Sequence, residues 1–215
     1  MKRILVTYAT MAGSTAEVAA AVAEELERAG LMAEARPIAQ VSSLEGYDGV
    51  VVGGPMIMGW HREARRFLKA HRNALQRVPF AVFVTAISLM QPEETIVDGV
   101  PVFVDDGLPK PPAQPGRLSF RERYAQLPRY MRPILRAARP ARPVSAGLFA
   151  GRLEYGRLKP WAVLFVMTII QAPAGDRRNW DAIREWAAAL PPLLAGEAAT
   201  AAMADSSVPP WLNPA

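Results

Sequence analysis

The stretch that decides the fold is RILVTYATMAGSTA, which spans residues 3–16. Its first part, Ile4 to Tyr8, is an apolar run that predicts a β-strand, and a helical pattern begins after the small and hydroxyl-bearing residues at 10–15. The backbone N–H groups of a first helical turn have no partner within the helix, and they lie at the positive end of the helix dipole. An anion binds readily at such a position. The stretch therefore predicts a strand–loop–helix unit that holds an anion.

The residue types in this loop favour a single terminal phosphate. Thr10, Ser14 and Thr15 offer hydroxyl donors, and Gly13 allows close approach of the backbone. The loop has no Lys or Arg, unlike a P-loop, and the chain start has no GxGxxG pattern. A plain helix cap is the alternative, although a cap needs only one hydroxyl at one position. The predicted phosphate-binding residues are Thr10, Met11, Ala12, Gly13, Ser14 and Thr15.

Strand and helix patterns alternate outward from this unit. A continuous apolar run such as residues 49–53 is typical of a parallel strand buried on both faces. We predict a doubly wound α/β fold with a five-stranded parallel sheet in the order 2-1-3-4-5. The expected strands are residues 3–8, 32–37, 49–53, 80–85 and 144–149. The expected helices are about residues 14–29, 62–75, 158–170 and 179–190.

A long, proline-rich and basic insertion separates the fourth and fifth strands, at about residues 91–142. Eight arginines lie between residues 117 and 142 against one acid, Glu122, whereas the whole chain has a net charge of +5. A connection of this length and charge is more often functional than filler. We expect it to belong to a single domain of residues 1–190, followed by a disordered tail at 191–215.

Within the insertion, turn and cap signals predict local structure. Asp98-Gly99 favours a tight hairpin at residues 95–104, with Pro101 keeping its second strand at a sheet edge. Ser119 and Glu122 have the spacing of a capping box and open a short helix that Pro128 ends. A second short helix is expected from about Pro133.

Three loops are predicted to meet where the strand order reverses, because ligands of open parallel sheets bind at the carboxyl ends of strands there. The loop after the third strand joins glycines to large soft side chains, which suit a flat aromatic ring. Core packing is the alternative for its methionines and for Trp60. A phosphate cradle beside a ring slot predicts FMN. The further predicted FMN-binding residues are Gly54, Pro55, Met56, Ile57, Met58, Gly59, Ala86, Ile87, Ser88 and Leu89.

Charge and composition indicate the partners. We predict that Arg132, Arg136 and Arg139 share a helix face and bind an anionic substrate, since arginine captures carboxylates with two hydrogen bonds. A solvated basic face is the alternative, and nucleic acid is the least favoured partner. The apolar run Trp161–Ile170 predicts a buried helix or, alternatively, a face that meets a membrane or a quinone. We expect a cytoplasmic protein, with peripheral contact to the membrane as the alternative.

The scarcity of metal-ligating residues restricts the chemistry. The chain has no Cys, and its two histidines are His61 and His71, so we expect neither a metal site nor a thiolate nucleophile. His61 is expected to be a solvated residue of a first helical turn. We assign no catalytic residue, since a flavin carries its own chemistry.

On these motifs the chain resembles flavodoxin-fold proteins, whose first loop reads S/T-x-T-G-x-T. Here Ala12 stands at the middle threonine, so one phosphate-binding hydroxyl is missing. The chain is more similar to the branch that includes the menaquinone-dependent protoporphyrinogen IX dehydrogenases. That similarity lies in residues 53–60, in LFAGRLEY at 148–155 and in the GDxRxWxxI pattern at 175–183. It covers about residues 1–85 and 144–190, whereas the insertion is longer and more basic.

The resemblance implies FMN as the cofactor, with oxidation of a porphyrinogen and transfer of the electrons to a quinone. We therefore expect an FMN-dependent oxidoreductase that transfers hydride between FMN and a bulky anionic or quinone-like substrate. Two alternatives stay open. A flavodoxin-type electron carrier usually docks through an acidic surface, which this basic chain does not suggest. A binding module that has lost FMN is kept open by Ala12.

Overall fold

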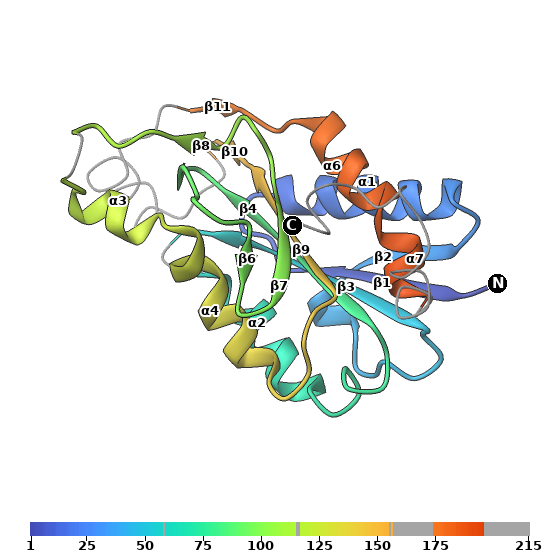
Figure 1. The fold of residues 1–215 in the computed structure, drawn as a ribbon. Coiled ribbons are helices and arrows are strands. Elements are labelled where there is room, and N and C mark those ends of the chain that lie inside the picture. The colour runs from blue at the N-terminus through green and yellow to red at the C-terminus, as the bar shows by residue number, and fades with distance from the viewer. Residues whose placement is uncertain (58, 115–116, 155, 157–173, 196–215) are drawn as a thin grey trace, which may run out of the picture.

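The computed structural model describes residues 1–57, 59–114, 117–154, 156 and 174–195 (Figure 1). Within these residues the main sheet has seven strands, in the order β2-β1-β3-β4-β9-β7-β6. They are β2 (Met32–Pro37), β1 (Arg3–Tyr8), β3 (Gly49–Met56), β4 (Phe80–Ala86), β9 (Ser145–Ala150), β7 (Val100–Val104) and β6 (Ile96–Val97). The first five of these are parallel neighbours in the predicted order 2-1-3-4-5, so the predicted fold class is confirmed.

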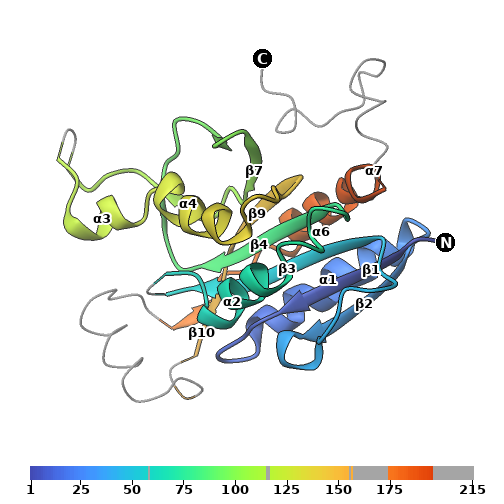
Figure 2. The same cartoon turned by 90° about the horizontal axis from the view of Figure 1, so that it is seen from below.

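Helices cover both faces of the sheet, which explains why its central strands are apolar throughout. One face packs on α1 (Ser14–Arg28), α6 (Trp180–Ala188) and α7 (Leu190–Leu194), through residues such as Ile4, Val6 and Val51. The other face packs on α2 (Arg62–His71) and α4 (Leu127–Ala138), through residues such as Leu5, Val50 and Val52. Figure 2 shows α2 and α4 side by side over that second face. Alternate residues of each strand thus enter opposite cores.

The insertion extends the main sheet, which the sequence did not predict. The hairpin at Asp98-Gly99 is confirmed, with φ of 49° and 79° at these two residues. The prediction that Pro101 keeps its strand at an edge is wrong, because β7 pairs in parallel with β9 and β6 forms the edge. Pairing with β9 begins at Val102, so the missing N–H of Pro101 falls just outside that ladder.

Two prolines of the insertion do not act as predicted. The capping box opens α3 (Phe120–Tyr124) as expected, with the Glu122 N–H donating to Ser119 Oγ at 3.3 Å. Pro128, however, lies in the first turn of α4 rather than ending α3, and Pro133 lies inside α4 rather than at its start. A proline in a first turn removes no intrahelical hydrogen bond, which is why α4 can begin at Leu127.

Smaller elements complete the described chain. Two-stranded pairs are formed by β5 (Leu89–Met90) with β8 (Pro109–Lys110), and by β10 (Arg152–Leu153) with β11 (Gly175–Asp176). A 3-10 turn, η1, covers Ile38–Gln40. Helix α2 ends at His71, earlier than predicted, and α7 stands where we expected the tail to begin. Met58, the apolar run Trp161–Ile170 and the rest of the tail from residue 196 lie outside the described residues. None of the helices in the described part could span a bilayer.

Candidate functional site

The carboxyl ends of β1, β3 and β4 lie side by side, which brings the predicted loops to one edge of the sheet. The Ala9 N–H donates to Gly53 O at 3.0 Å, so the first loop leaves the sheet beside the end of β3. Pro55 and Met56 are in register with Thr85 and Ala86. The loops after these strands therefore start from adjacent positions.

The first loop is shaped by Gly13, which has φ of 91° and stands immediately before α1. Its N–H donates to Thr10 Oγ1 at 2.9 Å. Among the described residues, no side chain caps the start of α1. The orphan N–H groups of the first turn are thus left for a ligand, and a left-handed φ suits glycine there.

The hydroxyls of this loop have different environments. Thr15 is buried, and its Oγ1 lies 3.3 Å from Thr85 Oγ1, so this residue ties the loop to β4. Thr10 is exposed, and its hydroxyl accepts from Gly13 while keeping its own proton for donation. Ser14 is partly exposed. Thr10 and Ser14 are therefore the hydroxyls that a ligand can reach.

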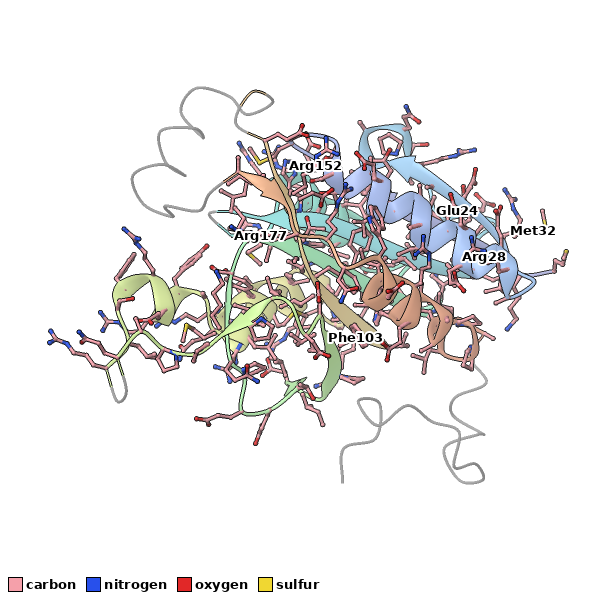
Figure 3. The ribbon with its side chains drawn as sticks, turned by 90° about the horizontal axis from the view of Figure 1, so that it is seen from above. Glu24, Arg28, Met32, Phe103, Arg152 and Arg177 are labelled. Atoms are coloured by element: carbon pink, nitrogen blue, oxygen red, sulfur yellow. The ribbon has the colours of Figure 1, made fainter. Side chains whose placement is uncertain are left out.

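A cluster of charges lies against the first turn of α1. Glu17 Oε2 accepts from Arg178 Nη1 at 2.7 Å, and Glu17 Oε1 lies 3.5 Å from Arg152 Nη1. The Arg178 side chain is only 3% exposed; its Nε donates to Asp176 at 2.8 Å, and its guanidinium lies over the Trp180 ring. Figure 3 shows Arg152 at the opposite end of α1 from Arg28.

The two arginines compensate a carboxylate that would otherwise repel an anion at this helix start. The hydrogen bond from Arg178 lowers the pKa of Asp176, and the same bond raises the pKa of Arg178 above its ordinary value. The sequence prediction gave no role to Glu17, Arg152 or Arg178. The signals that could have found the two arginines were the LFAGRLEY stretch, which includes Arg152, and the GDxRxW pattern, which includes Arg178.

The second loop is anchored by Trp60, which is buried and whose indole N–H donates to Gly54 O at 3.0 Å. A Cβ on Gly54 would lie 3.0 Å from that indole nitrogen, so glycine is needed for the close approach. Trp60 therefore packs inside the loop. Met56 is buried and Ile57 is partly exposed.

His61 has a structural role at the end of this loop. Its Nδ1 accepts from the Glu63 N–H at 3.4 Å, which caps α2. Burial lowers the pKa of His61, so the neutral imidazole that can accept this bond is favoured. The expectation of a solvated first-turn residue is met only in part, because His61 is the N-cap residue of α2 and is only partly exposed.

Two tyrosines of the insertion fasten it to the second and third loops. Tyr130 Oη donates to Ser88 O at 3.0 Å, and burial raises the pKa of Tyr130 to about 12. The Tyr124 hydroxyl is hydrogen-bonded to the backbone of Gly59, and the two tyrosine rings meet edge to face at 6.0 Å. The Met90 N–H donates to Ala125 O at 2.8 Å. The insertion is thus part of the site.

A cavity of about 510 Å³ lies between these loops and the insertion. From the predicted set it is lined by Met56, Ile57, Ile87, Ser88 and Leu89. Met90, at the end of the predicted third loop, also lines it. From the insertion it is lined by Lys110, Pro111, Ala113, Phe120, Arg121, Glu122, Tyr124, Ala125 and Tyr130, which the sequence did not predict. The lining is mainly apolar and aromatic. The Glu122 carboxylate accepts from the N–H groups of Ala113 and Ser119, and these bonds lower its pKa.

The structure does not bring Arg132, Arg136 and Arg139 to this cavity. Arg132 lies 3.4 Å from Asp98, in the turn at the amino end of β7, whereas the three loops lie at the carboxyl ends of the strands. Helix α4 runs from Tyr130 at the loops toward Arg139, which leads back to the start of β9. The predicted arginines are therefore exposed along a helix that leads away from the loops, and Lys110 and Arg121 are the basic residues in the cavity lining.

Comparison with known proteins agrees with this architecture. Residues 5–179 match the family model described as a flavodoxin domain. The chain is 24% identical over 190 residues to protoporphyrinogen IX dehydrogenase [quinone] of Escherichia coli strain K12, which covers 86% of this chain and 88% of that protein. A solved flavodoxin of Streptococcus pneumonia TIGR4 is 13% identical, with a TM-score of 0.44 over 91% of this chain and 99% of the other. Because the family match spans more than half of its length, the chain belongs to the flavodoxin domain family.

Proposed function

We propose that the protein is an FMN-dependent oxidoreductase that transfers two electrons between the flavin and a bulky, quinone-like or anionic substrate. The residues present fit FMN. Residues 10–15 would hold the phosphate through the uncapped start of α1, with Ser14 offering a hydroxyl in place of the one missing at Ala12. Residues 54–59 and 86–89 would hold the ring. Bound FMN would supply two-electron redox chemistry at that position.

The observation that carries the proposal is the cavity of about 510 Å³ beside the ring-binding loops. Its volume suits a substrate of drug size or larger, and its apolar lining suits a flat, hydrophobic molecule. A one-electron carrier needs an exposed flavin edge and no substrate cavity. The insertion extends the cavity beyond the ring-binding residues, and this extension favours an enzyme over the carrier alternative.

The chemistry of the lining supports a quinone or a porphyrinogen as substrate. Tyr124 and Tyr130 offer aromatic contacts to a planar molecule, and Lys110 and Arg121 would bind carboxylates attached to it. The relative from E. coli, by its name, acts on protoporphyrinogen IX and a quinone. We extend that substrate class to this chain.

The protein residues position the reactants and exclude water. With a pKa of about 12, Tyr130 keeps its proton at neutral pH, and its hydrogen bond fixes the Ser88 carbonyl at the cavity wall. Tyr130 is therefore a positioning residue for the third loop. The insertion supplies much of the cavity lining, which would limit the access of water to the reacting atoms.

The test begins with the visible spectrum of the purified protein and an FMN titration. Tight FMN binding, followed by re-oxidation of the reduced flavin by menadione or reduction of the oxidised flavin by protoporphyrinogen IX, would support the proposal. Absence of FMN binding would instead favour the binding-module alternative. FMN binding without reaction toward either substrate would favour the electron carrier.

A further inference from the structure

The short helix α3 carries an aromatic and basic surface at the mouth of the cavity. Phe120 is 73% exposed and Tyr124 is 36% exposed, although both line the cavity. Figures 1 and 2 both place α3 at an extremity of the molecule. We name this surface the α3 tip. It is defined by the exposed basic and aromatic residues of α3 and of the segments that flank the cavity there: Lys110, Arg117, Phe120, Arg121, Arg123, Tyr124 and Arg129.

The charge of the α3 tip is strongly positive. Five of its residues are basic and exposed. The single acid of α3 is Glu122, whose carboxylate accepts the backbone N–H groups of Ala113 and Ser119, each at 2.6 Å. Glu122 thus shapes the local fold, and the α3 tip presents cations around an exposed phenyl ring.

We infer that the α3 tip docks on an anionic lipid surface, with Phe120 at the boundary between headgroups and acyl chains. Aromatic and cationic side chains together are the composition that binds such an interface, since cations attract the headgroups and apolar area enters the boundary. Long arginine side chains can reach headgroups while their stems cover apolar surface. Docking in this way would face the cavity mouth toward the bilayer.

This inference deepens the proposed function and rests on it. Membrane docking serves an enzyme whose substrate is a quinone, because quinones dissolve in the bilayer. A cavity that opens at the lipid surface can take its substrate from that phase. Arg117, Arg123 and Arg129 are absent from the cavity lining, so substrate carboxylates in the cavity would not account for their position. An anionic lipid surface, which presents many negatively charged groups, accounts better for the position of these three arginines.

The absence of cysteine from the chain allows a direct test. Phe120→Cys, labelled with an environment-sensitive fluorophore, reports on the α3 tip in the full-length protein. Met32→Cys is the matched control, since Met32 is an exposed apolar residue that lies on the far side of the molecule from α3 (Figure 3). The probe surfaces are phosphatidylcholine vesicles with and without phosphatidylglycerol.

We expect the label at position 120 to shift to the blue and to be quenched by brominated lipid on anionic vesicles, while the label at position 32 stays unchanged. High salt should weaken this binding, because the attraction is electrostatic. No response on anionic vesicles, or an equal response at both positions, would overturn the inference. A response to an acidic peptide or to RNA without one to vesicles would overturn it too, in favour of a macromolecular partner.

Charge variants give an independent measurement by vesicle sedimentation. Arg117→Ala with Arg123→Ala removes two cations of the α3 tip, and we expect binding to weaken about 30-fold, since each basic residue near an anionic surface contributes about fivefold. Arg65→Ala with Arg66→Ala is the control, because it removes the same charge from exposed positions of α2. An equal loss in both double variants would reduce the effect to net charge and would overturn the inference.

The proposed function is measured separately on the unlabelled wild type and on the variant with Arg117→Ala and Arg123→Ala, whose substituted residues lie outside the cavity lining. FMN binding and turnover of a water-soluble quinone without vesicles do not depend on lipid contact. If these activities hold while vesicle binding fails, docking alone is refuted. If vesicle binding holds while FMN binding fails, the α3 tip stands as a lipid-binding surface and the oxidoreductase proposal falls.

Discussion

Two regions meet at the same edge of the sheet and are built in opposite ways. The phosphate side, at residues 10–15 with Glu17 and Arg178, relies on backbone N–H groups and on compensated charge. The cavity side, with Tyr124 and Tyr130, relies on aromatic side chains from a segment that is distant in the sequence. The difference indicates that the phosphate of the cofactor and the substrate would be bound by separate sets of residues, so each of these two sets can be disturbed without the other, whereas the ring-binding loops border both.

The largest effect is expected from a substitution on the phosphate side. Arg178→Met leaves Glu17 with the single, longer contact to Arg152 next to a phosphate dianion. We expect affinity for FMN to fall about 30-fold, in line with the loss of a charge-assisted hydrogen bond. Affinity for riboflavin, which has no phosphate, should stay nearly constant. Flavin fluorescence titrations with both compounds measure the two affinities.

A second substitution separates charge from structure at this position. Adding Glu17→Gln to Arg178→Met removes the uncompensated carboxylate in the first turn of α1, while Asp176 still lacks its partner, so we expect FMN affinity to recover in large part. Arg184→Met serves as the control, since Arg184 pairs with Asp181 on the surface of α6. Equal losses for FMN and riboflavin would show that Arg178 only holds the fold together.

The next largest effect is expected from a substitution on the cavity side. Ala113→Trp places a large ring in the cavity lining from an exposed loop position. We expect KM for menadione to rise about tenfold, equivalent to about 1.4 kcal/mol, with no change in FMN affinity. Gln114→Trp, one residue further and outside the lining, is the control. An unchanged KM would mean that the substrate does not use this cavity.

Tyr130→Phe tests how the insertion is fastened to the third loop. At neutral pH we expect the variant to unfold more easily by about 1 kcal/mol, because the Ser88 carbonyl loses its donor. The pKa of Tyr130 is raised from 10.0 to about 12 in the folded protein, so its stabilising contribution is complete below pH 10 and is lost as the pH rises toward 12.

The pH dependence makes this prediction specific. By pH 11 the wild type should have lost about 1.4 kcal/mol relative to the variant, slightly more than the difference of about 1 kcal/mol at neutral pH, so the two stabilities should converge and cross. Urea unfolding of both proteins between pH 7 and pH 11 measures this convergence. A constant difference would contradict a buried, neutral phenol at this position.

The smallest effect is expected from a substitution of Arg132, which tests where the substrate-binding region ends. Arg132→Ala removes a surface pair with Asp98, in the turn before β7, so we expect a loss of less than about 0.5 kcal/mol in the free energy of unfolding. KM for a carboxylated porphyrinogen should not change. The same substitution at Arg121, in the cavity lining, should raise that KM. A larger rise in this KM for Arg132→Ala than for the Arg121 variant would show that Arg132 contributes to substrate binding.

The parallel core and the phosphate loop could be predicted because their signals are local. Val50-Val51-Val52 is apolar at every position and can only be a strand covered on both faces, and Gly13 marks the turn into α1. The position of β7 could not be predicted, since its pairing with β9 joins segments about 40 residues apart. Proline signals were ambiguous for a physical reason: Pro128 would end a helix at an interior position, yet it is tolerated in the first turn of one.

The place of β7 in the sheet has a consequence for engineering. An insertion that only decorated the surface could be trimmed without harm, but β7 supplies the hydrogen-bonding neighbour of β9. A variant shortened between β4 and β9 would leave the backbone of β9 unpaired along one side, and such an edge recruits other chains. Any attempt to reduce this protein to a minimal flavodoxin core must therefore keep residues 95–104 or replace them with another strand.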